Sequence, residues 1–131
     1  MGKLNLEELV ARATQSEADK LKVKILTIDR EGNTIQAMKK DIRTVSKTLD
    51  METGTTEDRF QAEMKLIYDH CPILHEKQLQ AVYSCAEPMD VVEKVFQSDM
   101  GLIGKAAEEI LDMYGLAEKE NSENPVDAVK N

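Results

Sequence analysis

Four apolar stripes follow one another between Phe60 and Leu116, and this stretch constrains the fold more than any other part of the chain. It contains all five aromatic residues of the protein. Each stripe has the three- and four-residue spacing that places apolar side chains on one face of a helix. None extends beyond about four turns, so none of these helices is stable alone and they must pack on one another. The predicted core therefore lies in residues 59–115.

Prolines and a glycine separate and end the stripes. Pro72 ends the first predicted helix, because proline lacks the amide proton and disfavours helical geometry in the residue before it. Pro88 suits the first position of a later helix, and Gly115 suits a C-terminal stop. The stripes are Phe60-Met64-Ile67-Tyr68-Cys71, Leu79-Val82-Tyr83-Ala86, Met89-Val92-Val95-Phe96 and Ile103-Ala106-Ala107-Ile110-Met113-Tyr114. Six residues are expected to be mostly buried: Phe60, Ile67, Tyr83, Val92, Phe96 and Ile110.

Residues 20–38 have the pattern of a β-hairpin. Basic and apolar residues alternate in its first half, Lys20, Lys22 and Lys24 with Leu21, Val23 and Ile25. A polar turn at 29–33 precedes a second run at 34–38. The lysines either protect an edge strand from unwanted pairing or form a basic face for an acidic ligand. A lone hairpin is marginal, so it must lie against helices or extend its sheet with another chain. A further helix is predicted by the spacing of Met38, Ile42, Val45 and Leu49, with Asp41 near its positive end.

The N-terminal segment predicts an amphipathic helix that begins at Leu6 and ends near Ala13. Asn5 is its N-cap, and Glu8, three residues later, completes a capping box. Its apolar face contains Leu6, Leu9, Val10 and Ala13. We expect this helix to dock on its own domain, and the alternative is a role as a helix-in-groove ligand of a partner.

The segment 117–131 has no apolar periodicity and is rich in Glu and Asn. We expect a flexible acidic tail, with a short recognition segment around Val126, Ala128 and Val129 as the alternative. Together with the N-terminal helix, it supplies the candidate partner-binding residues: Leu6, Leu9, Val10, Val126 and Val129.

The expected fold class is α+β and mainly α, a small N-terminal β-hairpin followed by a packed unit of short helices. Residues 1–54 hold the N-terminal helix, the hairpin and a helix, residues 55–116 the helical core unit of the same domain, and residues 117–131 the tail. A hydrophobic content of 41% with 32% charged residues is that of a soluble globular protein. No export signal or membrane-spanning run is visible, so we expect a cytoplasmic location and no membrane partner.

Charge is unevenly distributed along the chain. Residues 1–54 carry ten Lys or Arg and nine Asp or Glu, whereas residues 55–131 carry seven and sixteen, giving net charges of +1 and −9. An acidic field repels phosphate backbones and favours a partner with a basic surface, so we expect no nucleic-acid partner. The other interpretation is an ordinary solvated helix surface.

No catalytic, cofactor or metal site is expected. The six glycines are scattered and form no phosphate-binding loop. The possible zinc ligands are His70, Cys71, His75 and Cys85, but they contain no C-x-x-C pair, and adjacent residues on a helix, such as His70 and Cys71, point in different directions. Both cysteines are expected to be reduced and buried, and the protein is expected not to be an enzyme.

The run LIYDHCPILHEKQLQAVYSCAEPMDVVEKVF, residues 66–96, resembles the small tail assembly chaperones of contractile-tailed bacteriophages and related prophage elements. The Ile-Tyr before a short Pro-Ile-Leu connection, the Val-Tyr helix end and the Glu-Pro-Met-Asp-Val-Val-Glu-Lys-Val-Phe segment carry the resemblance. It covers roughly the last two thirds of the chain, including the charged C-terminal segment.

The resemblance implies a non-enzymatic chaperone of phage tail assembly. Such a protein binds the tape-measure protein, the tail-tube protein or both in the bacterial host cytoplasm, and it is absent from the mature virion. A homo-oligomer is compatible with this role. The alternative is a small structural or adaptor protein that is retained in a finished assembly.

The resemblance also implies that a longer product can arise when the ribosome slips back by one base. Val129, Lys130 and Asn131 can be encoded by codons that contain an uninterrupted run of A, which permits such slippage. The alternative is that these residues merely belong to a disordered tail. The codons used in the gene decide between the two.

Overall fold

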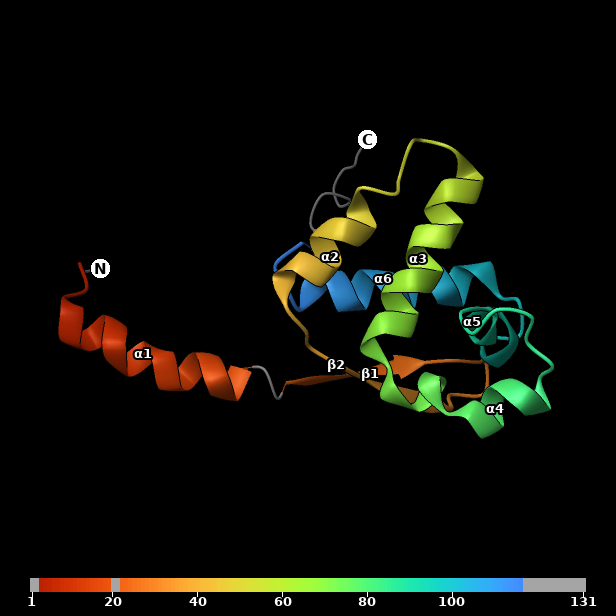
Figure 1. Ribbon diagram of the computed structural model, residues 1–131, viewed down its shortest axis with the longest axis horizontal. Coiled ribbons are helices and arrows are strands. Elements are labelled where there is room, and N and C mark those ends of the chain that lie inside the picture. The colour runs from red at the N-terminus through yellow and green to blue at the C-terminus, as the bar shows by residue number, and fades with distance from the viewer. Residues whose placement is uncertain (1–2, 20–21, 117–131) are drawn as a thin grey trace.

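The computed structural model describes residues 3–19 and 22–116, and it shows an α+β fold that is mainly helical (Figure 1). One antiparallel β-hairpin precedes a body of short helices, as the sequence predicts. The elements, in chain order, are α1 (Leu6–Asp19), β1 (Val23–Thr27), β2 (Thr34–Met38), α2 (Ile42–Leu49), α3 (Thr56–His70), the 3₁₀ helix η1 (Pro72–His75), α4 (Lys77–Val82), α5 (Asp90–Val95) and α6 (Met100–Asp112). None of the helices in the described part of the chain is long and apolar enough to cross a bilayer.

The hairpin is held together by its turn. Asp29 Oδ1 accepts hydrogen bonds from the backbone N–H groups of Glu31 and Asn33, and Asp29 Oδ2 accepts from the Asn33 side-chain amide at 2.7 Å. These bonds hold the pKa of Asp29 below its usual value. Gly32 has φ +92°, which glycine adopts without steric cost. The strands pair in the register Lys24 to Ala37.

The two faces of the hairpin are the reverse of what a basic-and-apolar alternation suggests. The face directed toward the helical body contains Lys24 and the fully buried Leu26. The opposite face carries Val23 and Ile25, which are exposed. Lys24 Nζ lies 3.2 Å from Asp112 Oδ2 on α6, so this lysine joins the hairpin to the body and is not part of an open basic surface.

Helices α3 and α6 cross at the centre of the body, and the other elements lie around them (Figure 1). Thr55 Oγ1 caps α3 by accepting from Asp58 N at 3.1 Å. Asp99 caps α6 by accepting from Leu102 N, and it also receives two hydrogen bonds from the Arg30 guanidinium of the hairpin turn. The cap of α6 therefore also ties the hairpin to the body.

The hydrophobic core is formed where the hairpin and α2 meet the crossing of α3 and α6. Strand β1 packs on α6, and β2 packs on α3 and η1. The buried apolar residues are Leu26, Ala37, Val45, Ala62, Met64, Leu66, Ile67, Cys71, Leu74, Val91, Val92, Phe96, Ile103, Ala106, Ala107 and Ile110. The predicted burial of Ile67, Val92, Phe96 and Ile110 is confirmed.

The second predicted stripe is largely wrong. Tyr83 was expected in the core, but it is exposed, and so are Val82 and Ala86. Only Leu79 of this stripe packs against the core. The reason is length: α4 has six residues and lies at the edge of the body, so it presents little more than one turn to its neighbours.

Three smaller differences concern the other stripes. Phe60 is half-buried and packs at the margin of the core. Helix α5 begins at Asp90, two residues after Pro88, and the Pro88 carbonyl accepts from Val91 N in the preceding turn.

In α2, Val45 is buried together with Thr48, whereas Ile42 and Leu49 of the predicted stripe are exposed. Asp41 lies at the positive end of α2 as predicted, and it is also the N-cap, accepting from Arg43 N at 2.9 Å.

A buried histidine and a tyrosine tie the C-terminal end of α6 to α3. His70 Nδ1 donates to the Leu66 carbonyl at 2.8 Å, since a carbonyl only accepts. In the neutral ring Nε2 then accepts from the Tyr114 hydroxyl at 2.7 Å, and that hydroxyl accepts from Lys40 N.

Gly115 has φ +77° and lies at the C-terminal stop of α6, as predicted. Leu116 N donates to the Leu111 carbonyl there.

Helix α1 begins at Leu6 as predicted, but it ends at Asp19 and not near Ala13. The capping box is present: Asn5 Oδ1 accepts from Glu8 N at 2.9 Å, and Glu8 Oε1 accepts from Asn5 N at 3.0 Å. Residues 14–19 contain neither proline nor glycine, so no helix-breaking residue stops α1 before Asp19. Helix α1 projects away from the body along the long axis of the molecule (Figure 1).

Candidate functional site

The apolar face of α1 is the first candidate binding surface. Leu6, Leu9 and Val10 are exposed by 77%, 53% and 63% of their surfaces. They fall at i, i+3 and i+4, so they form one stripe, which we call the α1 stripe. Figure 1 shows α1 extending from the body without a helix or strand beside it. The expected docking of α1 on its own domain is therefore not seen.

The remaining sequence candidates, Val126 and Val129, lie outside the described residues. The structure thus gives a position to three of the five predicted partner-binding residues, and it places these three together on α1.

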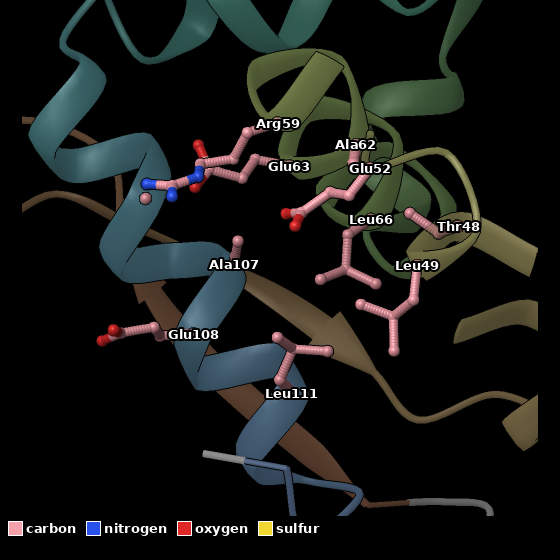
Figure 2. Close-up of a pocket in the computed structure, with 11 residues that line it drawn as sticks. Thr48, Leu49, Glu52, Arg59, Ala62, Glu63, Leu66, Ala107, Glu108 and Leu111 are labelled. Atoms are coloured by element: carbon pink, nitrogen blue, oxygen red, sulfur yellow. The ribbon is translucent and has the colours of Figure 1, made fainter. Parts of the chain in front are cut away.

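A cleft between α2, α3 and α6 is the second candidate, and sequence reasoning missed it. Its cavity measures about 380 Å³. Leu49, Leu66 and Leu111 form its apolar part, and Figure 2 shows their side chains facing a common space with the Glu52 carboxylate directed toward it. Gly104 lies in its wall: a Cβ there would come within 3.7 Å of a Glu63 carboxylate oxygen. A larger side chain at this position would therefore narrow the cleft.

The cleft is acidic. Glu52, Glu63 and Glu108 line it together with a single basic residue, Arg59. Burial raises the pKa of Glu63, the nearby carboxylates of Glu52 and Glu108 raise it further, and Arg59 opposes both effects. A cation placed between these carboxylates would be attracted, and its alkyl stem would contact the leucines. Lysine and arginine side chains have this combination of a charged head and an apolar stem.

The cleft was missed because its residues come from three helices that are distant in sequence. Arg59 and Glu63 are spaced i, i+4 on α3, and Gly104 and Glu108 are spaced i, i+4 on α6. That repeated spacing was the available signal. It looks like an ordinary solvated helix face until the crossing of α3 and α6 brings the two pairs together.

Both histidines among the possible zinc ligands have structural partners, and Cys85, which was expected to be buried, is only partly buried. His70 is bonded to Leu66 and Tyr114, and burial lowers its pKa. Burial raises the pKa of the Cys71 thiol to about 12, so this cysteine stays protonated and unreactive. His75 bonds to the Tyr68 carbonyl and stacks on the Tyr68 ring. Within residues 3–19 and 22–116, no three His, Cys, Asp or Glu side chains gather as a metal site.

Comparison with protein-family models, with curated proteins and with solved structures gave no significant match. The geometry of the α1 stripe and of the acidic cleft is therefore the basis for the functional argument.

Proposed function

We propose that this protein is a non-enzymatic phage tail assembly chaperone. In this role it binds the tape-measure protein, the tail-tube protein or both in the host cytoplasm during assembly, and it leaves before the virion is complete. The exposed α1 stripe is the observation that carries the proposal. The resemblance of residues 66–96 to the tail assembly chaperones supplies the class of client.

The α1 stripe suits a client that offers an apolar groove. Burying a leucine or valine side chain contributes about 1.5–3 kcal/mol, so three such residues together offset a cost of association of about 4–15 kcal/mol only in part, and a second contact must add to them. Helix α1 is already capped at its N-terminus, which reduces the ordering that binding must offset. An amphipathic helix set apart from its own domain is the usual form of a helix-in-groove ligand.

The acidic cleft supports the same role through a second contact. A cationic residue on a client segment would place its charge near Glu52 and Glu63, and its stem against Leu66. The net charge of −8 attracts a basic client over a longer range. A chaperone that holds its client at two separated points gains in effective concentration, since the second contact forms within one complex.

Co-expression of the protein with each tail protein, followed by affinity purification, tests the proposal. The wild-type chain should recover the tape-measure or the tail-tube protein. The double variant Leu6→Asp/Leu9→Asp should recover at least tenfold less, because it places charges in the α1 stripe while acidic residues near a helix N-terminus keep the helix stable. Recovery of neither tail protein by the wild-type chain would overturn the proposal.

A matched control separates the α1 stripe from general surface hydrophobicity. Ile73 and Val82 are also exposed apolar residues, on η1 and α4, so Ile73→Asp/Val82→Asp makes an equivalent change away from α1. This control should recover the client normally. Purified tails then distinguish a chaperone from a retained structural or adaptor protein: a chaperone is absent from the particles, whereas a retained subunit is present in stoichiometric amount.

A further inference from the structure

The hairpin has an apolar face that no part of the described structure covers. We call its apolar residues, Val23, Ile25 and Met38, the outer hairpin face. Gln36, which pairs with Ile25, lies on the same side, as does the Thr27–Thr34 pair. Val23 and Met38 are paired in the strand register, and Ile25 follows on the same side of β1. Val23 is 47% exposed and Ile25 is 50% exposed, and Met38 is half-buried. The other face of the hairpin is already covered by α3, η1 and α6, so it is the exposed apolar area of Val23 and Ile25 that would gain from a covering helix.

The α1 stripe and the outer hairpin face are complementary in charge as well as in hydrophobicity. Residues 6–19 contain four acidic residues and one basic residue, a net charge of −3. Residues 20–40 contain six basic residues and two acidic ones, a net charge of +4. Lys24 and Arg30 already pair with Asp112 and Asp99, and without them the hairpin segment still has a net charge of +2. Docking α1 on a hairpin therefore joins opposite charges around an apolar contact, which favours this pairing over one between two α1 helices.

The sizes of the two elements also match. Helix α1 has 14 residues, a length of about 21 Å at 1.5 Å per residue. The strands have five residues each, about 17 Å at 3.3 Å per residue. One helix can therefore cover the whole outer face.

A second copy of the chain is the occupant that the arrangement favours. Helix α1 continues from the open end of its own hairpin away from the body, so the α1 stripe lies beyond the outer face of the same chain (Figure 1). Two copies related by a two-fold axis can each place α1 on the other's hairpin, and both contacts are then equivalent.

We propose that α1 of one copy packs its stripe on the outer hairpin face of a second copy, forming a reciprocal homodimer. This inference goes beyond the proposed function and requires no tail protein. A client that occupies the α1 stripe would compete with the second copy. The two contacts are small, so the dimer should dissociate on dilution and should weaken as salt screens the opposite charges.

The purified full chain tests the dimer by light scattering after size exclusion, over a range of concentrations. The monomer has a mass of 14.7 kDa, and the wild-type protein should approach twice this value at high concentration. Leu9→Lys changes the α1 stripe, and Ile25→Glu changes the outer hairpin face. Each variant alone should remain monomeric at concentrations tenfold above those at which the wild type dimerises, because both of its contacts carry a buried charge.

Mixing the two variants gives the decisive result. A mixed dimer has one contact that is wild type on both sides, α1 of the Ile25→Glu chain on the hairpin of the Leu9→Lys chain. Its other contact joins the two introduced charges of opposite sign. The mixture should therefore recover a dimer that neither variant forms alone.

The control and the contrary outcomes follow from the same design. Val82→Lys changes a residue that is 73% exposed on α4 and should leave the dimer intact. Circular dichroism and a urea melt of each variant should match the wild-type monomer, which shows that the body is folded. A monomeric wild type at high concentration, single variants that still dimerise, or a mixture that stays monomeric would each overturn the proposal. The last result would mean that the α1 stripe and the outer hairpin face do not contact each other in the dimer.

Discussion

Helices α1 and α3 have similar lengths and similar N-terminal caps, yet the apolar side chains of α1 are exposed to solvent and those of α3 are buried. They contain 14 and 15 residues. Asn5 caps the first and Thr55 caps the second, each by accepting a hydrogen bond from the backbone N–H three residues later. Leu9 in the α1 stripe is exposed, whereas Ile67 on α3 is completely buried.

The comparison shows what an apolar stripe determines. The spacing of apolar residues decides which face of a helix gains from contact, and the cap decides where the helix begins. Neither decides which surface the face meets. Helix α3 meets α6 and the hairpin within its own chain, whereas α1 meets nothing in the described structure and is available to a second molecule.

Removing a side chain from the core should produce the largest difference in unfolding free energy between the helical body and α1. Phe96→Ala removes a fully buried aromatic side chain and should lower the free energy of unfolding by about 3–5 kcal/mol. Leu9→Ala should change the unfolding of the monomeric body by less than about 0.5 kcal/mol, because the side chain is exposed. Urea melts at a concentration below dimerisation measure both values. A Phe96→Ala protein as stable as its parent would show that the core is assigned incorrectly.

Removing one hydroxyl should have the next largest effect. In Tyr114→Phe, His70 Nε2 and the Lys40 N–H both lose their partner, and His70 is buried. The expected cost is about 1–3 kcal/mol of unfolding free energy. Tyr83→Phe is the matched control, since Tyr83 is exposed and its loss of a hydroxyl should change the melt very little. Equal effects at the two positions would contradict the network around His70.

The same network should make the body sensitive to mild acid. Burial holds the pKa of His70 below 6.5, although the Leu66 carbonyl and Asp69 act in the opposite direction and Lys40 acts with burial. The unfolded chain therefore takes up this proton first as the pH falls, so the free energy of unfolding should decrease below about pH 6.5 and level off below the folded pKa.

A variant isolates the contribution of His70 to this dependence. Glu63 acts with the opposite sign, because burial raises its pKa and the folded protein then binds the proton more tightly. The difference between wild type and His70→Gln removes that background, as Gln cannot titrate. Urea melts from pH 7.5 to 5 should show a steeper loss of stability for the wild type, and parallel curves would contradict a buried neutral His70.

Removing the N-caps of α3 and α1 should have the smallest effects on stability, and it compares the two helices most directly. Thr55→Ala should lower the free energy of unfolding by about 0.5–2 kcal/mol, because α3 is part of the cooperative core. Asn5→Ala removes the same kind of cap from α1, so it should reduce helical circular dichroism without shifting the urea midpoint. A shifted midpoint for Asn5→Ala would mean that α1 folds together with the body.

Much of the fold was predictable from local chemistry. The turn at Asp29–Asn33, the caps at Asn5, Asp41 and Thr55, and the stop at Gly115 all depend on hydrogen bonds within a few residues, and all are present. Of the candidate site, the sequence identified the α1 stripe. The acidic cleft escaped because Glu52, Glu63 and Glu108 become neighbours only when three helices pack.

The sequence by itself determined the helices, the hairpin and the apolar stripes, because these follow from backbone hydrogen bonding and side-chain spacing along a continuous segment. Tertiary structure alone decided which stripes are covered. It buried Val45 and left Ile42 exposed on the same helix, and it turned Lys24 inward to Asp112 while Ile25 faces out. The physical reason is that burial depends on the surface available from the rest of the chain. Where the rest of the chain offers no surface to contact, as at Val23, Ile25 and the α1 stripe, an apolar face stays exposed and can contact another molecule.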